Sequence, residues 1–206
     1  MKISVVTPSI RPSGLEVVRD SLAKQTFKDF EWLVEINTSG EHDLNFAFNK
    51  MLDRAQGELI VFYQDFIKIP NDGLQKFWDF HVEHPDTLFT APVGKVQKWG
   101  EDPVYDWRTE KTEIGAMECE FDWGAAPKAI LKDIGGFDER LDQWWSFDNV
   151  SVGKRAGLCG YQFTCLPEVR AIALDHDAHE EHPFRDKYNP AQVNQILNSY
   201  ETNPRI

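Results

Sequence analysis

KISVVT at residues 2–7 is a short run rich in β-branched residues, and Pro8 and Ser9 end it. Such a run predicts a buried strand that enters a loop. Two further apolar runs follow at residues 32–36 and 58–63, and stretches with helical spacing fill the two intervals. Strand, helix, strand, helix, strand is the order of right-handed parallel crossovers. The first third of the chain therefore predicts an α/β fold with a mostly parallel central sheet flanked by helices.

The remaining two thirds predict a mixture of helices and short strands. Helices are expected over residues 71–85, 127–134, 147–156 and 191–200. Strands are expected over residues 88–93, 161–164 and 169–174. Residues 94–123 show little helical period and predict a hairpin or a long loop, while 124–126 are small residues that read as a loop. No internal repeat and no linker divides the chain, so we expect one domain.

The composition excludes several classes of protein. The 206 residues include 22 Lys and Arg against 34 Asp and Glu, a formal net charge of −12, which disfavours general binding to nucleic acid. No run approaches the roughly 20 apolar residues of a membrane span, and the opening residues break too early for a signal peptide. We therefore expect a cytoplasmic protein. The three cysteines lack close pairing, which favours reduced thiols over a disulfide framework or a zinc site.

Three loops are the expected ligand loops of the predicted sheet. In open α/β sheets, ligands bind beyond the carboxyl ends of the strands, where the strand order reverses. The loops that follow the three predicted strands are residues 7–11, 35–39 and 64–66. Because the chain is acidic, a phosphate-bearing ligand needs a local source of positive charge there, for which a metal ion is the expected source.

Four segments, in order, carry a resemblance to a known family. They are ISVVTPSIR at 3–11, AFNKMLDRAQGELIVFYQD at 47–65, GAAPKAILKDIGGFDERL at 124–141 and DNVSVGKRAGLCGYQFTCLPEVRAIALDH at 148–176. This order resembles the family 2 glycosyltransferases, which have the nucleotide-sugar-binding fold called GT-A. The resemblance implies one GT-A-like domain over 1–206, with a mostly parallel sheet and a small antiparallel segment. It divides the chain into a nucleotide-binding half (1–93), an acceptor and catalytic half (94–180) and a C-terminal tail with a helix (181–206).

The resemblance places the nucleotide at the first two loops and beside the third strand. In the family, the loop after the first strand contacts the base and the ribose. The matching residues here are Thr7, Pro8, Ser9 and Arg11. The family's base-binding aspartates are absent from the second loop, so Glu35 or Asn37 would substitute, and Gln64 is expected beside them. An ordinary strand-end turn with an exposed arginine is the alternative.

The end of the third strand is the predicted metal site. In the family this strand usually ends in Asp-x-Asp, whose oxygens hold a divalent cation between the two donor phosphates. The present chain has Tyr63-Gln64-Asp65 there. The resemblance implies that Asp65 and His176 bind Mn²⁺ or Mg²⁺, with the phosphates as further ligands. The alternatives are that Asp65 caps a turn, or that His176, His179 and His182 form a metal cluster of their own.

Asp148 is the predicted catalytic base. It stands seven residues before Arg155, where relatives carry the first acid of a Glu-Asp pair, and Asn149 stands where they carry the second. The resemblance implies that Asp148 takes the proton of the acceptor hydroxyl as that oxygen attacks the anomeric carbon. The plainer alternative is that Asp148 only complements the helix dipole.

Four more residues are expected near the sugars. Trp144 and Trp145 present aromatic faces on which a sugar can stack, and Gly124 and Ala125 let the chain approach the donor. The expected activity is inverting transfer from a nucleotide-diphosphate donor, with a UDP-sugar favoured, to a hydroxyl of a carbohydrate or another acceptor, in a possible homo-oligomer. The alternatives are an inactive relative that binds nucleotide-sugars or glycans, and a metal-dependent hydrolase.

Overall fold

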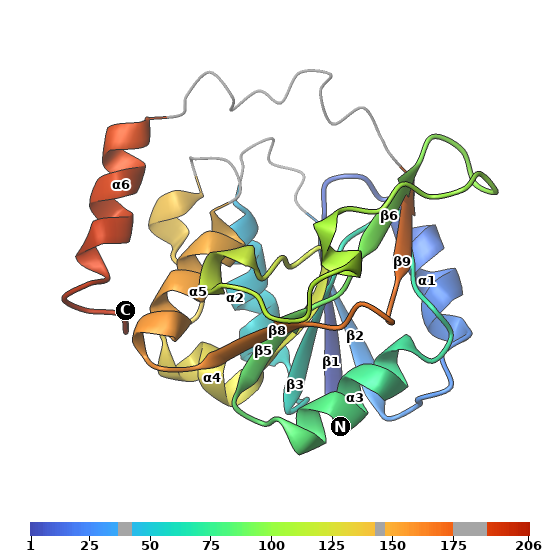
Figure 1. The fold of residues 1–206 in the computed structure, drawn as a ribbon, viewed down its shortest axis with the longest axis horizontal. Helices are drawn as coiled ribbons and strands as arrows, with labels where there is room; N and C mark the ends of the chain where they lie inside the picture. The colour runs from blue at the N-terminus through green and yellow to red at the C-terminus, as the bar shows by residue number, and fades with distance from the viewer. Residues whose placement is uncertain (37–42, 143–146, 175–188) are drawn as a thin grey trace.

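A six-stranded sheet forms the centre of the computed structural model, which describes residues 1–36, 43–142, 147–174 and 189–206. The strand order is β2-β1-β3-β7-β5-β8, and helices cover both faces (Figure 1). Strand β1 (Ile3–Ser9) pairs in parallel with both β2 (Phe30–Ile36) and β3 (Leu59–Tyr63). Helices α1 (Gly14–Ala23) and α2 (Leu44–Arg54) lie between these strands in the chain. The two parallel crossovers predicted for the first third are therefore confirmed.

The second half of the sheet contains the strand that sequence patterning did not predict. Residues 124–126, expected as a loop, lie within β7 (Trp123–Pro127), which runs antiparallel between β3 and β5 (Thr87–Thr90). The low strand propensity of Gly and Ala hides this strand in the sequence, and its two neighbours override that propensity. Strand β8 (Gln162–Cys165) completes the sheet in parallel with β5.

The predicted strand over residues 88–93 is correct only in part, because the chain changes sheet within it. The first part belongs to β5, whereas β6 (Val93–Val96) joins a second sheet of order β4-β9-β6. Its other strands are β4 (Ile67–Lys68) and β9 (Ala171–Leu174). Pro92 at the change of sheet has no backbone N–H for the central ladder, and its carbonyl instead accepts from the backbone N–H of Ala171.

A long connection follows β6 and returns to the central sheet at β7. It contains two short 3₁₀ turns, η1 (Trp107–Thr109) and η2 (Ala116–Glu118). The long loop expected for residues 94–123 is thus largely what the structure shows. Turn η2 packs closely on α5 (Asp148–Leu158). A Cβ added to Gly153 of α5 would lie only 2.0 Å from the carbonyl oxygen of Ala116 in η2, so this contact requires glycine.

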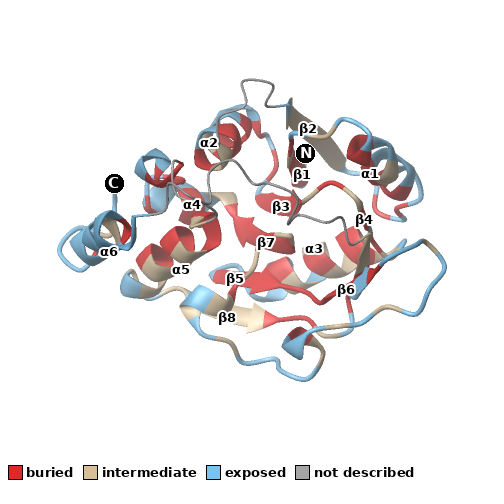
Figure 2. Cartoon of the chain, turned by 90° about the horizontal axis from the view of Figure 1, so that it is seen from above, coloured by how far each residue is buried: buried red, intermediate tan, exposed pale blue. Residues whose placement is uncertain are grey.

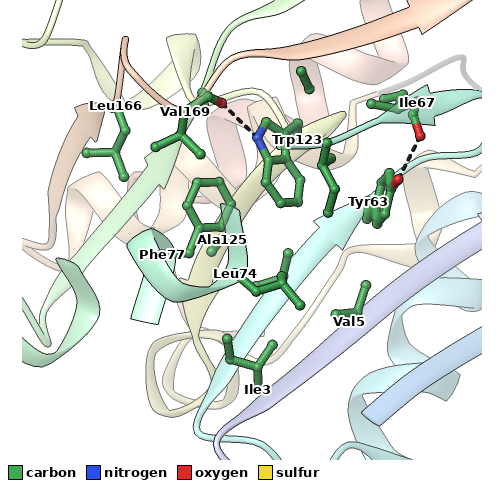
Figure 3. Close-up of a cluster of buried hydrophobic side chains, with 14 of the residues drawn as sticks. Ile3, Val5, Tyr63, Ile67, Leu74, Phe77, Trp123, Ala125, Leu166 and Val169 are labelled. Atoms are coloured by element: carbon green, nitrogen blue, oxygen red, sulfur yellow. Dashed lines mark hydrogen bonds between the residues drawn. The ribbon is translucent and has the colours of Figure 1, made fainter. Parts of the chain in front are cut away.

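Two apolar clusters hold the layers together. One lies between the sheet and the helices α1 and α3 (Gly73–Glu83), and the other between the sheet and α2, α4 (Lys128–Asp133) and α5. In the first cluster, Trp123 stacks on Phe77 at 4.3 Å between ring centroids and donates from Nε1 to the carbonyl of Val169 (Figure 3). Tyr63 donates to the carbonyl of Ile67 at 2.7 Å. Because each buried side chain of this size contributes about 1.5–3 kcal/mol, the ends of β3 and β7 are firmly fixed.

The C-terminal helix α6 (Pro190–Ser199) begins with a capped first turn, in which the Asn189 side chain accepts from the backbone N–H groups of Ala191 and Gln192. The 3₁₀ turn η3 (Glu139–Leu141) lies between α4 and α5 in the chain, and Tyr200 donates to Asp138 at its start.

In the part of the chain that the structure describes, none of the helices has the length and apolar character needed to span a bilayer.

Candidate active site

The ends of β1 and β3 bring three of the predicted residues into contact. Asp65, only 8% exposed, accepts a hydrogen bond from Ser9 Oγ at 2.7 Å. Arg11 Nη2 lies 3.2 Å from the other carboxylate oxygen, and the backbone N–H of Arg11 donates to Ser9 Oγ. Ser9 and Arg11 were predicted from the first loop and Asp65 from the third strand, so the structure joins the predicted nucleotide and metal positions.

The backbone around Asp65 is tightly constrained. Phe66 has φ of 59°, in the left-handed region that a side chain of this size rarely adopts, and its ring lies under the Arg11 guanidinium at 5.1 Å. Helix α1 begins against this turn, since a Cβ added to Gly14 would lie 2.6 Å from the Phe66 ring and 2.8 Å from Asp65 Cβ. Glycine at position 14 is therefore what allows α1 to approach Asp65.

Since the resemblance implies a nucleotide diphosphate beside Asp65, Gly14→Ala is expected to weaken its binding by about 10- to 100-fold, because the new methyl group displaces Asp65 and Phe66 without removing a polar group. Calorimetric titration with UDP measures the effect. Gly115→Ala is the matched control, since the nearest atom to its Cβ is a side-chain oxygen of Glu118 at 3.3 Å. Equal affinity of Gly14→Ala and wild type would show that this approach has no role in binding.

Burial raises the pKa of Asp65, and the Ser9 hydroxyl and the Arg11 guanidinium partly offset that rise. Both oxygens of this carboxylate thus already have partners. Each oxygen keeps a further lone pair that could ligate a divalent cation, with the Arg11 guanidinium as a competing positive charge. Among the described residues, no group of three His, Cys, Asp or Glu side chains could hold a metal ion. The second predicted ligand, His176, lies outside the described residues, as do His179 and His182.

The other predicted nucleotide residues have different surroundings. Thr7 is fully buried, and its hydroxyl accepts a hydrogen bond from Trp32 Nε1 at 2.9 Å, so it supports the pairing of β1 with β2. Glu35 lies opposite Pro8 in the sheet and forms ion pairs with Lys50 and Arg54 of α2. Asn37 lies outside the described residues.

Asp148 begins α5 and is only 5% exposed. Burial raises its pKa to about 6, the backbone N–H groups of Asp148 and Asn149 oppose that rise, and the charges of Asp142 and Asp122 add to it. Asn149 Nδ2 donates to Glu120 Oε2 at 2.9 Å. Asp148, Glu120 and Asp122 together form an acidic group at the start of α5. The sequence predicted only Asp148 as a site residue.

A buried arginine organises the neighbouring segment. Arg108, 4% exposed, donates to both carboxylate oxygens of Asp122, at 2.6 and 2.9 Å, and to Asp106 through Nε at 2.9 Å. The sequence did not indicate a role for Arg108, Asp106, Asp122 or Glu120. Residues 94–123 show several charges without helical period, and this pattern does not reveal that the four side chains lie close together at the sheet.

Asp122 connects the two parts of the site. The backbone N–H of Gln64 donates to the carbonyl of Asp122 at 3.1 Å, and Gln64 directly precedes Asp65. The Asp122 carboxylate in turn raises the pKa of both Asp148 and Glu120. Figure 2 shows β3 and β7 side by side at the centre, between α1 and α5. Asp122, directly before β7, thus contacts the residue that precedes Asp65 and also acts on the pKa of Asp148.

The predicted sugar-contacting residues are placed less favourably. Ala125 is fully buried in the apolar cluster next to Phe77, so its side chain does not face the edge. A Cβ on Gly124 would lie 2.7 Å from the carbonyl oxygen of Glu120 and 2.8 Å from that of Phe89 in β5, so glycine here allows close packing of the backbone. Trp144 and Trp145 lie outside the described residues.

Comparison with known proteins places this geometry in a known fold. No protein-family model and no curated protein matches the sequence, but solved structures match. TarS 1–349 of S. aureus in complex with UDP-GlcNAc, a family 2 glycosyltransferase, matches with a TM-score of 0.74 at 19% identity. That match covers 98% of this chain and 67% of the other. The fold is GT-A.

Further TarS structures agree. The complex of TarS 1–349 with UDP matches at a TM-score of 0.65 and 21% identity, over 97% of this chain and 70% of that one. A longer TarS chain matches at 0.66, and the present chain spans 43% of its length. The GT-A fold that the order of segments predicted is confirmed, including the mostly parallel sheet with its antiparallel portion.

Proposed function

We propose that the protein transfers a sugar from a nucleotide-diphosphate donor, with a UDP-sugar favoured, to an acceptor hydroxyl with inversion at the anomeric carbon. The observation that carries this proposal is the position of the Ser9, Arg11 and Asp65 contacts. They lie at the carboxyl ends of β1 and β3 in a GT-A fold, where ligands of open α/β sheets bind. The TarS structures with this fold have UDP-GlcNAc or UDP bound, which supports a UDP-sugar as the donor.

The donor side depends on charge. Arg11, whose side chain is 37% exposed, reaches the edge of the sheet with a guanidinium that can pair with a phosphate oxygen. Asp65 holds that guanidinium now and would supply an oxygen ligand to Mn²⁺ or Mg²⁺. The cation, when bound, would offset the negative charge of the departing diphosphate. His176 is proposed as its second protein ligand.

The acceptor side depends on a carboxylate. As the acceptor oxygen bonds to the anomeric carbon, its proton passes to the acidic group at the start of α5, in which Asp148 is the residue predicted from the sequence. The bond from that carbon to the diphosphate oxygen breaks, and its electron pair leaves with the diphosphate. Attack from the face opposite the leaving group inverts the carbon. Orientation of the two substrates supplies a large share of the rate.

Release of nucleotide diphosphate from UDP-, GDP- and dTDP-sugars tests the proposal. We expect turnover of at least one donor, and Asp148→Asn should lower kcat by about 100-fold or more, because it removes the charge at the start of α5. Asp20→Asn, an exposed acid of α1, is the control and should keep the wild-type rate. Donor binding without release would instead identify an inactive nucleotide-sugar-binding protein, and absence of both would contradict the proposal.

A further inference from the structure

The acidic group at the start of α5 contains a second carboxylate that is more open than Asp148. Glu120 is partly exposed, whereas Asp148 is only 5% exposed. One oxygen of Glu120, Oε2, accepts from Asn149 Nδ2 at 2.9 Å. No hydrogen bond from a described residue reaches the other oxygen, Oε1. Among the described residues, none competes with a substrate hydroxyl for a hydrogen bond to Oε1.

The hydrogen bond between Asn149 and Glu120 occurs at a position where the resembled family has an acid. The resemblance in the sequence places a second acid at position 149, and this chain has an amide there. The amide contacts a carboxylate that comes from 29 residues earlier in the chain. We propose, on the basis of the proposed function, that Glu120 is a catalytic residue that accepts the proton of the acceptor hydroxyl, and that Asn149 is its positioning residue.

The fold fixes the backbone of Glu120 from both sides. Its chain neighbours Cys119 and Phe121 are buried in the apolar cluster shared with α2 and α5. The carbonyl of Glu120 lies so close to Gly124 that a Cβ there would approach it to 2.7 Å. This backbone and the hydrogen bond from Asn149 together restrain the carboxylate, and general base catalysis requires such a fixed geometry.

Burial and neighbouring charges shift the pKa of the Glu120 carboxyl. Burial raises the pKa of Glu120 to about 7, the charge of Asp122 adds to the rise, and Arg108 opposes it. The charges of Asp148 and Asp106 raise it further. A base with a pKa near the working pH is ionised often enough to act and basic enough to hold the proton it receives. Asp148 and Glu120 interact, so a measured pKa belongs to the pair.

The proton balance of the step is simple. The O–H bond of the acceptor breaks as its oxygen bonds to the anomeric carbon, and the proton moves to Oε1 of Glu120. The electron pair of the broken sugar–phosphate bond leaves on the nucleotide diphosphate. Because Glu120 is partly exposed, it returns its proton to solvent before the next turnover.

Glu120→Gln in the 206-residue chain tests the proposal. Gln retains an oxygen that can accept from Asn149 but cannot take up the proton, so kcat should fall by about 100-fold while UDP affinity stays within about threefold. Glu110→Gln, an exposed glutamate on the same connection, is the control and should match wild type. If Glu120→Gln retains the wild-type kcat while Asp148→Asn is inactive, the proposal is overturned and the transferase function stands. If wild type turns over no donor, both fall.

Asn149→Asp tests whether Glu120 is the group whose ionisation controls the rate. A negative charge beside Glu120 raises the pKa of that carboxyl, so the acid limb of the kcat/KM profile should move upward by about half a pH unit or more. The limb is expected near pH 7 in wild type. A limb that stays in place in Asn149→Asp would overturn the role of Glu120 as the titrating base.

A stability measurement provides a readout that is independent of turnover. With a pKa that burial raises from 4.5 to about 7, folded Glu120 retains a proton that the unfolded chain releases, so its ionisation destabilises the fold as pH rises. Glutamine at position 120 does not ionise, so the Glu120→Gln protein does not lose stability in this way as pH rises. The melting temperature of Glu120→Gln, relative to wild type, should rise from about pH 5 to about pH 8. A difference that does not change with pH would contradict the raised pKa.

Discussion

Asp65→Ala is expected to lower kcat/KM for the nucleotide-sugar by about 1,000-fold. Asp65 fixes both the Ser9 hydroxyl and the Arg11 guanidinium at the edge of the sheet, and it is the proposed oxygen ligand of a divalent cation. Removing it would disperse the positive charge that is proposed to face the diphosphate of the donor. Because Asp65 is a buried charge, the substitution also removes a desolvation cost, and the fold is expected to survive.

Steady-state release of nucleotide diphosphate measures this prediction, with Asp79→Ala as the control. Asp79 is an exposed acid of α3 whose carboxylate accepts from Gln75 at 2.8 Å. Asp65→Asn should lie between Asp65→Ala and wild type, since an amide can still bond to Ser9 but cannot pair with Arg11. An Asp65→Ala protein with wild-type kcat/KM would remove Asp65 from the site.

Arg155→Met is expected to lower the free energy of unfolding by about 3–5 kcal/mol. Arg155 is fully buried in α5 and donates to the carbonyls of Ile134 at 2.6 Å and Gly136 at 2.7 Å, as well as to Ser151. Methionine of similar length leaves these carbonyls buried without donors, at about 1–3 kcal/mol each. Chemical denaturation measures the loss.

The matched control for Arg155→Met is Arg205→Met. Arg205 also pairs with an acid, Asp133, but its side chain is 54% exposed, and surface pairs contribute about 1 kcal/mol or less. Similar losses in the two variants would show that the buried contacts of Arg155 add nothing to stability.

Arg155 also explains why two of the sequence segments occur together. The carbonyls that it binds belong to the Gly-Gly turn after α4, where Gly135 and Gly136 have φ of 84° and 79°. Both values lie in the left-handed region that glycine adopts without strain. The order of the GGFDE motif and the downstream arginine therefore reflects one set of buried hydrogen bonds, and this is why it could be used to predict the fold.

The alternation of apolar strand runs with helical spacing was sufficient to predict the first half of the fold. The strand runs at residues 2–7, 32–36 and 58–63 alternate with helical spacing, and each one corresponds to an observed strand. The second half could not be predicted equally well. Strand β7 has the sequence WGAAP, in which the small residues and proline after Trp123 show no strand pattern, and its pairing with β3 and β5 appears only in three dimensions.

The candidate site divides in the same way. The mutual contact of Ser9, Arg11 and Asp65 could be predicted, because strand ends place all three at the same edge of the sheet. Glu120 and Arg108 could not, since they lie on a connection whose course is set by tertiary packing. The same limit applies to Thr7, whose position at a strand end suggested a ligand but whose side chain is buried against Trp32.

The most direct test of the central claim is the melting temperature of the wild type and Asp65→Ala with UDP, UDP-GlcNAc and other nucleotide-sugars, with and without Mn²⁺. A ligand at about 100 times its Kd stabilises the folded state by about 2.7 kcal/mol, or about 5–10 °C for a chain of this size. We predict such a rise for wild type and its loss in Asp65→Ala. No rise with any nucleotide, or an equal rise in both proteins, would contradict a nucleotide-sugar site at the edge of the sheet.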